Sequence, residues 1–271
     1  MKNKLLILMI TFCALPAILL AWSENDYISS LIKKGEFSEA LTLMDKSTFE
    51  PSIADKYKGQ IYYGLYNPDS AIYYLEKTYR NGIQDDATII AFSQALLWKK
   101  NFKDASSLLK QVQDKSDLDY LKVRANQHEL LGELKDALKI YEKVIPAEEL
   151  PYGTMERKAI LLSWMKKFDA SIALFDKIID TEIVSEPLRV RCLVKKAEVI
   201  AWKKDFDTSI EILDAVVEEH PKNTAARFVK AQIFEWLGKY KDAKNLYKDI
   251  LLVDKENVEA KWKLEKLLWV N

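Results

Sequence analysis

The chain has 271 residues, and its 41 Lys and Arg balance 41 Asp and Glu, so the formal net charge is zero. This balance argues against a nucleic-acid binder, because such proteins carry a broad basic surface. Gly and Pro together make 14 of 271 residues, about 5%, against roughly 12% in average proteins. That composition excludes collagen-like chains, disfavours turn-rich all-β folds and predicts a helical protein.

The N-terminal segment has the pattern of a secretory signal peptide. Lys2 and Lys4 precede an apolar stretch, residues 5–20, that is shorter than the roughly 20 residues of a membrane-spanning helix. Ala21 and Ser23 provide the small residues expected before a cleavage site. We therefore predict a signal peptide at 1–23 and a mature chain that begins at Glu24; retention of the segment as an anchor is the alternative.

Cleavage there determines the compartment and the disulfide content that we expect. We expect the mature chain to be periplasmic, secreted or otherwise associated with a bacterial envelope, and to have no membrane span once the signal peptide is removed. Since Cys13 lies in the predicted signal peptide, Cys192 is the single cysteine of the mature chain. An internal disulfide is then impossible, so the fold must be held together by its core.

A small residue recurs along the mature chain at intervals of 31 to 38 residues, each time just after a short predicted turn. We call these seven residues the anchors: Ala40, Ala71, Ala105, Ala137, Ser171, Ser209 and Ala243. A period close to 34 residues indicates a repeat protein, in which each repeat is one supersecondary unit.

Other positions keep a fixed distance from the anchors, and we number them relative to the anchor. Position +4 is large and apolar in every repeat, and position −3 is so in all but the second, which has Pro68. Position −12 is small in all but the first, as Gly59, Ser93, Ala125, Ala159, Ala197 and Ala231. This pattern predicts two amphipathic helices around a tight turn, with small residues where helices approach closely.

These positions resemble the tetratricopeptide repeat, whose 34-residue unit has a small residue and an aromatic on its first helix, then Ala and a later aromatic on its second. The matching pairs are Gly59 with Tyr62, Ala231 with Phe234, Ala137 with Tyr141, and Ala243 with Tyr247. The early Trp of that family is absent, and Pro221 alone provides its terminal Pro.

The resemblance implies an all-α fold, an α-solenoid of about seven helix-turn-helix units. We expect the repeat array to occupy residues 24–255. The segment 256–271 is predicted to form a C-terminal capping helix, because Val258, Trp262, Leu267 and Leu268 are apolar among polar neighbours. No unit can bury its apolar face alone, so stability requires that neighbouring units stack.

A series of Trp side chains recurs on another face of the first helices, at position −7. At about 100° per residue, this position lies about 140° from the small position −12. In tetratricopeptide families the surrounding arc, which holds positions −8, −11, −15 and −18, usually lines a concave groove. The candidate groove residues are therefore Trp98, Trp164, Trp202, Trp236, Gln94, Asn126, Glu129, Glu198, Gln232 and Glu235. The other interpretation is that each Trp simply packs in the core between neighbouring first helices.

The sequence offers no pattern for catalysis, for a cofactor or for a metal. Gly59 and Gly64 have the glycine spacing of a phosphate-binding loop, but Leu65 and Tyr66 occupy the places of its Lys and Ser or Thr. Paired cysteines or histidines at metal-ligand spacing are absent from the sequence. His128 and Cys192 both fall on predicted helices, where a structural role is expected for each.

Two functions fit these observations. The first is a non-catalytic exported scaffold whose groove binds a protein or peptide partner of a bacterial envelope complex. The second is a periplasmic module that binds a glycan or exopolysaccharide by stacking Trp faces on sugar rings. The arrangement of small residues, Trp and aromatic turns also resembles the tetratricopeptide arms of bacterial exopolysaccharide-export and cellulose-synthesis proteins. The sequence identifies neither the partner nor the oligomeric state.

Overall fold

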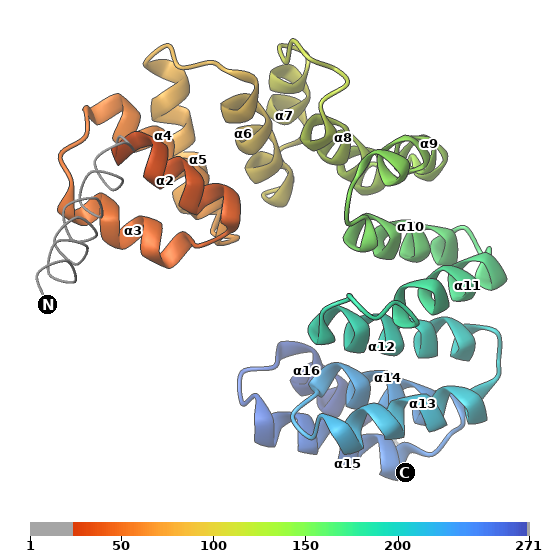
Figure 1. Cartoon of the computed structure of the whole chain (residues 1–271). Helices are drawn as coiled ribbons and strands as arrows, with labels where there is room; N and C mark the ends of the chain where they lie inside the picture. The colour runs from red at the N-terminus through yellow and green to blue at the C-terminus, as the bar shows by residue number, and fades with distance from the viewer. Residues whose placement is uncertain (1–23, 270–271) are drawn as a thin grey trace, which may run out of the picture. The chain divides into compact units, whose positions relative to one another are not determined.

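The computed structural model describes residues 24–269, and every regular element in that range is a helix (Figure 1). Seven helix pairs and a final single helix follow one another, which confirms the predicted all-α repeat fold. The predicted signal peptide lies outside the described residues. The described helices fall into two compact units, one that ends at Gln127 and one that begins at His128.

The first unit contains three helix pairs and most of a seventh helix. Its elements are α2 (Glu24–Lys34), α3 (Phe37–Lys46), α4 (Pro51–Gly64), α5 (Pro68–Arg80), α6 (Asp86–Trp98), α7 (Phe102–Leu109) and α8 (Leu118–Leu130). Pro68, the exception at position −3, is the first residue of α5, where a proline is compatible with a helix because its missing N–H has no intrahelical partner.

The second unit continues the same alternation and ends on a single helix. Its elements are α9 (Leu134–Val144), a 3-10 turn η1 (Ile145–Ala147), α10 (Tyr152–Trp164), α11 (Phe168–Ile179), α12 (Glu186–Trp202), α13 (Phe206–Glu219), α14 (Thr224–Trp236), α15 (Tyr240–Val253) and α16 (Val258–Leu267). A second helix typically packs on its own first helix and on the first helix of the next repeat, as α5 does with α4 and α6 and as α13 does with α12 and α14.

The anchors lie where helices approach most closely. All seven are completely buried, and so are five residues at position −12: Ser93, Ala125, Ala159, Ala197 and Ala231. At Gly59 a Cβ atom would lie 2.7 Å from the Cγ of Leu75, so a side chain there would collide with α5. The serine anchors Ser171 and Ser209 each donate a hydrogen bond of 2.7 Å to the carbonyl of the residue at position −12. Steric exclusion therefore explains the period that the sequence shows.

The turn between the two helices of each repeat has one left-handed residue, always at position −5. Glycine fills it in three repeats, at Gly35, Gly132 and Gly238, with φ between 71° and 78°. The other four repeats use Tyr66, Lys100, Lys166 and Lys204. A non-glycine residue in this conformation is uncommon and costs energy, so the shape of the turn is imposed by the packing of the two helices.

Candidate binding groove

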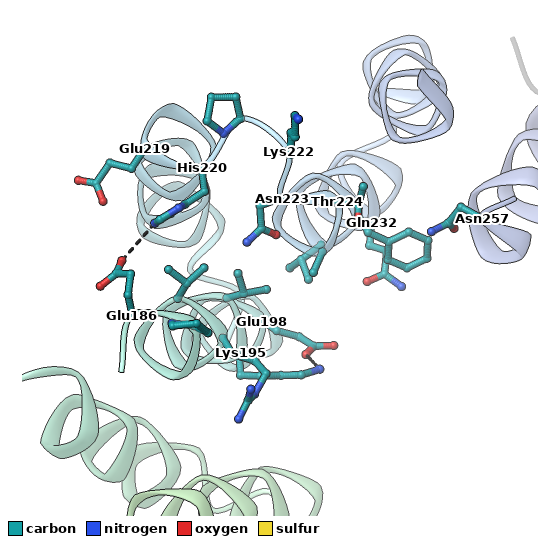
Figure 2. A pocket seen from close by; sticks show the side chains of 18 of the residues that line it. Glu186, Lys195, Glu198, Glu219, His220, Lys222, Asn223, Thr224, Gln232 and Asn257 are labelled. Atoms are coloured by element: carbon teal, nitrogen blue, oxygen red, sulfur yellow. Dashed lines mark hydrogen bonds and ion pairs between the residues drawn. The ribbon is translucent and has the colours of Figure 1, made fainter. Parts of the chain in front are cut away.

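A groove of about 1280 Å³ lies in the second unit, between α12, α14 and the start of α16. Figure 2 shows its side chains, which come from these helices and from the segment that joins α13 to α14. First helices of successive repeats form its walls, because second helices pack behind them. The groove is thus on the face that first helices present in a repeat array.

The floor of the groove is apolar and belongs to the core. Val190 and Val194 of α12 and Val229 of α14 are each less than one-tenth exposed. The ring of Phe228 also lines the groove, and it meets the ring of Tyr247 edge-on at 5.4 Å. Since the three valines belong to one core cluster and Phe228 contacts Tyr247, packing fixes the floor, which is pre-formed.

The walls carry charged side chains that are already paired. Lys195 donates to Glu198 on the same helix at 2.9 Å. Arg191 binds Glu156 of α10 through two hydrogen bonds of 2.6 Å, a bidentate arrangement that fixes the guanidinium plane. Gln232 completes the wall formed by α14. A ligand would therefore meet oriented donors and acceptors above the apolar floor.

The mouth of the groove is formed at helix ends. Asn223 and Asn257 line it and use their side-chain oxygens to cap α14 and α16, accepting from backbone N–H groups at 2.9 and 3.0 Å. On the same joining segment as Asn223, His220 lies 3.2 Å from Glu186, and Figure 2 shows their contact beside Glu219.

The three side chains Glu186, Glu219 and His220 could together approach a cation, since their ligand atoms lie within 4.8 Å of one another. They are exposed or half-buried, and Glu186 already pairs with His220. Exposed acidic groups are common without a metal, so we assign this cluster no metal. Among the described residues, Glu219, Glu259 and Lys222 line the groove without an ion pair.

Two of the ten candidate groove residues, Glu198 and Gln232, line this groove, and both stand at position −11. Positions −15 and −18 of the same repeats also line it, as Val194 with Arg191 and Phe228 with Ala225. These positions belong to the predicted groove arc, but the candidate residues were its Trp and polar members. The apolar residues of the same arc form the floor of the groove.

In the first unit, two candidate residues at position −11, Gln94 and Asn126, lie together. Asn126 of α8 donates to the side-chain oxygen of Gln94 of α6 at 3.2 Å, and Gln94 is buried. The two amides therefore form a link between neighbouring first helices. Their hydrogen-bonding groups face each other, as expected for equivalent positions of adjacent repeats.

The two glutamates at position −8 belong to a repeated internal network. Glu129 is buried, accepts a hydrogen bond from the hydroxyl of Tyr141 at 2.5 Å, and pairs with Arg157 of the next first helix. Glu235 is bound in the same way by Tyr247 and by Lys263, the latter at 2.9 Å. In each case the tyrosine stands at position +4, and the cation follows the glutamate by 28 residues.

Burial determines the ionisation of this network. Desolvation raises the pKa of Glu129 above its usual value, and the opposing effects of Arg157 and Tyr141 do not overcome it. Desolvation, followed by the neighbouring glutamate, raises the pKa of both Tyr141 and Tyr247. Both tyrosines therefore stay protonated and donate their hydrogen bonds throughout the physiological range.

The four Trp side chains stand at the C-terminal ends of first helices and do not line the groove. Trp164 and Trp236 are each 48% exposed, whereas Trp98 and Trp202 are half-buried against the core. Trp202 packs near Phe168 of the preceding repeat, with ring centroids 6.4 Å apart, and Trp236 lies 6.2 Å from Phe206.

Cys192 has the environment of a structural residue. Its side chain is completely buried, and burial raises the pKa of the thiol to about 12. A thiol that stays protonated is a poor nucleophile. None of the helices described is long and apolar enough to cross a membrane.

The model of the tetratricopeptide-repeat family matches residues 203–267, which contain the α13 to α16 part of the array and one wall of the groove. A comparison with curated proteins finds no significant match.

Solved structures share the fold at low sequence identity. A chain of the APC/C hetero-tetramer Cut9–Hcn1 superimposes with a TM-score of 0.67 and 13% identity, over 90% of this chain and 48% of that one. The present chain thus spans about half the length of that relative. A tetratricopeptide-repeat protein from Parabacteroides merdae superimposes with a TM-score of 0.57 and 18% identity, over 80% of this chain and 91% of that one.

Proposed function

We propose that this chain, whose residues 203–267 match the tetratricopeptide-repeat family, is a non-catalytic scaffold whose groove between α12, α14 and α16 binds a peptide segment of a protein partner. The observation that carries the proposal is the groove itself, a pre-formed apolar floor beneath oriented polar side chains. Binding sites commonly combine an apolar lining with a few placed polar groups.

The size and form of the groove favour a peptide over a small metabolite. Its volume of about 1280 Å³ exceeds the roughly 300–1,000 Å³ of ordinary small-molecule pockets. It is open along the helices, so a short extended or helical segment fits, with one apolar side chain on the floor formed by Val194 and Phe228. The relative from the Cut9–Hcn1 hetero-tetramer belongs to a protein assembly, which is consistent with a scaffold role.

We further propose that the protein acts outside the cytoplasm, in a bacterial envelope. The predicted signal peptide supports this location. N-terminal sequencing of the native protein should give Glu24 as the first residue in a periplasmic or envelope fraction. Recovery of Met1 from a soluble cytoplasmic pool would contradict the proposal.

The binding function is tested by affinity capture from an envelope extract with three forms of the mature chain. Gln232→Arg places a long cation in the groove, where it should block a peptide. Glu211→Arg adds the same side chain at an exposed site of α13 that does not line the groove. We expect the wild type and Glu211→Arg to capture the same partner and Gln232→Arg to lose it.

Circular dichroism melting of all three forms separates a blocked groove from a damaged fold. Capture of the same partner by Gln232→Arg at wild-type yield, with an unchanged melting temperature, would show that the groove does not bind it. Loss of the partner from Glu211→Arg as well would have the same meaning, because that residue is remote from the groove.

A further inference from the structure

The turn between α4 and α5 differs from the other six turns in the residue at its left-handed position. That position holds glycine or lysine elsewhere, but here it holds Tyr66, with φ of 54°. A bulky side chain in this conformation is a backbone outlier. Because glycine or lysine forms the same turn in neighbouring repeats, the turn itself does not require an aromatic ring. Outliers of this kind are concentrated at functional sites.

The ring of Tyr66 is mostly exposed and lies against other aromatic rings. The residue is 79% exposed, and its ring centroid is 5.3 Å from that of Trp98, at the end of α6. On the same Trp98 stacks Tyr63 of α4, at 5.4 Å and with the ring planes within 19° of parallel. Tyr63 and Trp98 are half-buried in the core of the first unit, so they hold the position of the exposed ring.

Four repeats have Trp at position −7. Of these, only the repeat with Trp98 follows a turn whose left-handed residue is aromatic, Tyr66. The turn before Trp164 has Gly132, that before Trp202 has Lys166, and that before Trp236 has Lys204. We call the cluster of Tyr63, Tyr66 and Trp98 the aromatic platform. Trp98 stands at a position where Trp recurs in other repeats, whereas Tyr66 is particular to this turn.

Two ion pairs lie near the platform residues: Lys99 of one pair directly follows Trp98, and Asp119 of the other acts electrostatically on Tyr63. Asp69 and Lys99 form an ion pair of 2.9 Å, and their side chains are 77% and 48% exposed. Asp119 pairs with Lys122 at 2.8 Å on the first turns of α8, and its charge contributes, after burial, to a raised pKa of the Tyr63 hydroxyl. Carboxylates and ammonium groups in these positions can accept from, and donate to, hydroxyl groups of a ligand above the rings.

We propose that the aromatic platform is a glycan-binding site, which takes a pyranose ring of a polysaccharide or oligosaccharide on the exposed face of Tyr66 and the edge of Trp98. A pyranose has one face of weakly positive C–H groups, which packs on the negative face of an aromatic ring. It also has a rim of hydroxyl groups, which match Asp69 and Lys99. This site lies in the first unit and is independent of the peptide groove.

The surrounding charges favour a sugar over a proline-rich peptide. Aromatic grooves that bind such peptides read a ring and a backbone carbonyl, and a carbonyl needs donors alone. Near the platform residues, the ion pairs Asp69–Lys99 and Asp119–Lys122 offer both donors and acceptors. Hydroxyl groups, which both donate and accept, use both kinds of partner.

The test uses the mature chain and titrates it by calorimetry with cellohexaose, chitohexaose and maltohexaose, which present three different pyranose chains. Tyr66→Lys installs the residue that the turns at Lys100, Lys166 and Lys204 already use, so it should keep the fold. The control is Trp164→Ala, which removes an equally placed Trp whose preceding turn has no aromatic ring. A decaproline peptide serves as the competing probe.

We expect at least one hexaose to bind the wild type, Tyr66→Lys to weaken that binding by about tenfold or more, as truncation of an aromatic anchor does, and Trp164→Ala to bind like the wild type. The melting temperature of Tyr66→Lys should equal or exceed that of the wild type. The proposal is overturned if none of the three hexaoses binds at about 10 mM, because a ligand at that concentration reveals binding even where Kd is above about 1 mM. It is equally overturned if Tyr66→Lys binds unchanged, if Trp164→Ala loses binding to the same extent, or if decaproline alone binds.

Discussion

The network of Glu129, Tyr141 and Arg157 leads to a prediction that can be worked through from the repeat itself. Of the seven repeats, the fourth and the last have Glu at position −8, and the same two have Tyr at position +4. The fifth repeat has Ser163 and Phe175 at these positions. The pair Glu129→Ser and Tyr141→Phe therefore transplants the residues of one repeat into the preceding one.

The expected energies follow from which polar group each single change leaves unpaired. Tyr141→Phe removes a hydrogen bond to a buried carboxylate, which costs about 1.5–3 kcal/mol. Glu129→Ser leaves the hydroxyl of Tyr141, a residue only 3% exposed, without its acceptor, at about 1–3 kcal/mol. The double variant leaves neither group unpaired. The side chain of Arg157 is 45% exposed and can turn to water, so the loss of its ion pair with Glu129 adds little to the cost.

We therefore expect the double variant to be more stable than the sum of the single changes predicts, with a coupling of about 1–2 kcal/mol, as is typical for residues in one hydrogen-bond network. Urea unfolding of the wild type and the three variants at pH 7, followed by circular dichroism, gives this coupling. Glu142→Ser, at an exposed site of α9, controls for the substitution itself. Additive single effects, within about 0.5 kcal/mol, would refute the proposed dependence of the two residues on each other.

Three further predictions follow from burial. Because burial raises the pKa of Glu129, the folded state holds the proton of this carboxyl more tightly than the unfolded state. The resulting stability is present below the ordinary Glu pKa of about 4.3 and is lost as pH rises through the folded-state pKa. Glu129→Gln should therefore reduce the decline in melting temperature over that pH rise. Ala197→Phe should overpack a fully buried helix contact and cost about 1–3 kcal/mol in urea unfolding, and unchanged stability would show that the repeat register is wrong. Trp202→Ala should cost about 3 kcal/mol, the lower end for a buried Trp, whereas Trp236→Ala, which truncates a half-exposed side chain, should cost about half as much; equal losses in thermal melts would contradict the difference in their burial.

The repeat register could be read from the sequence because it depends on steric exclusion, which acts on residue size alone. A residue such as Gly59 or Ala197 must be small where two helix backbones meet, and that requirement returns in each repeat. The floor of the groove could also be predicted from the sequence, because Val194 and Phe228 stand at position −15, which belongs to the predicted groove arc.

Two features of the candidate site depend on contacts with other helices, and the angular position of a residue on its own helix does not predict such contacts. The angle on the helix places the Trp position about 140° from the small position, but Trp202 stands at a helix end and its ring lies near Phe168 of the preceding repeat. Glu129 was expected to face a ligand, but Tyr141 and Arg157 occupy its oxygens. The correlation between positions −8 and +4 was present in the sequence and would have indicated this second contact.

The same network accounts for the charge pair inside the groove. Arg157 and Lys263 stand at equivalent places on their first helices, and each pairs with the glutamate of the preceding repeat. Lys195 occupies this place on α12, but the preceding repeat has Ser163 where the glutamate would be. Without that partner, Lys195 pairs with Glu198 on its own helix and lines the groove. In the repeat that has no glutamate at position −8, the cation of the next first helix therefore lines the groove, where it can meet a ligand, and does not pair across the helix interface.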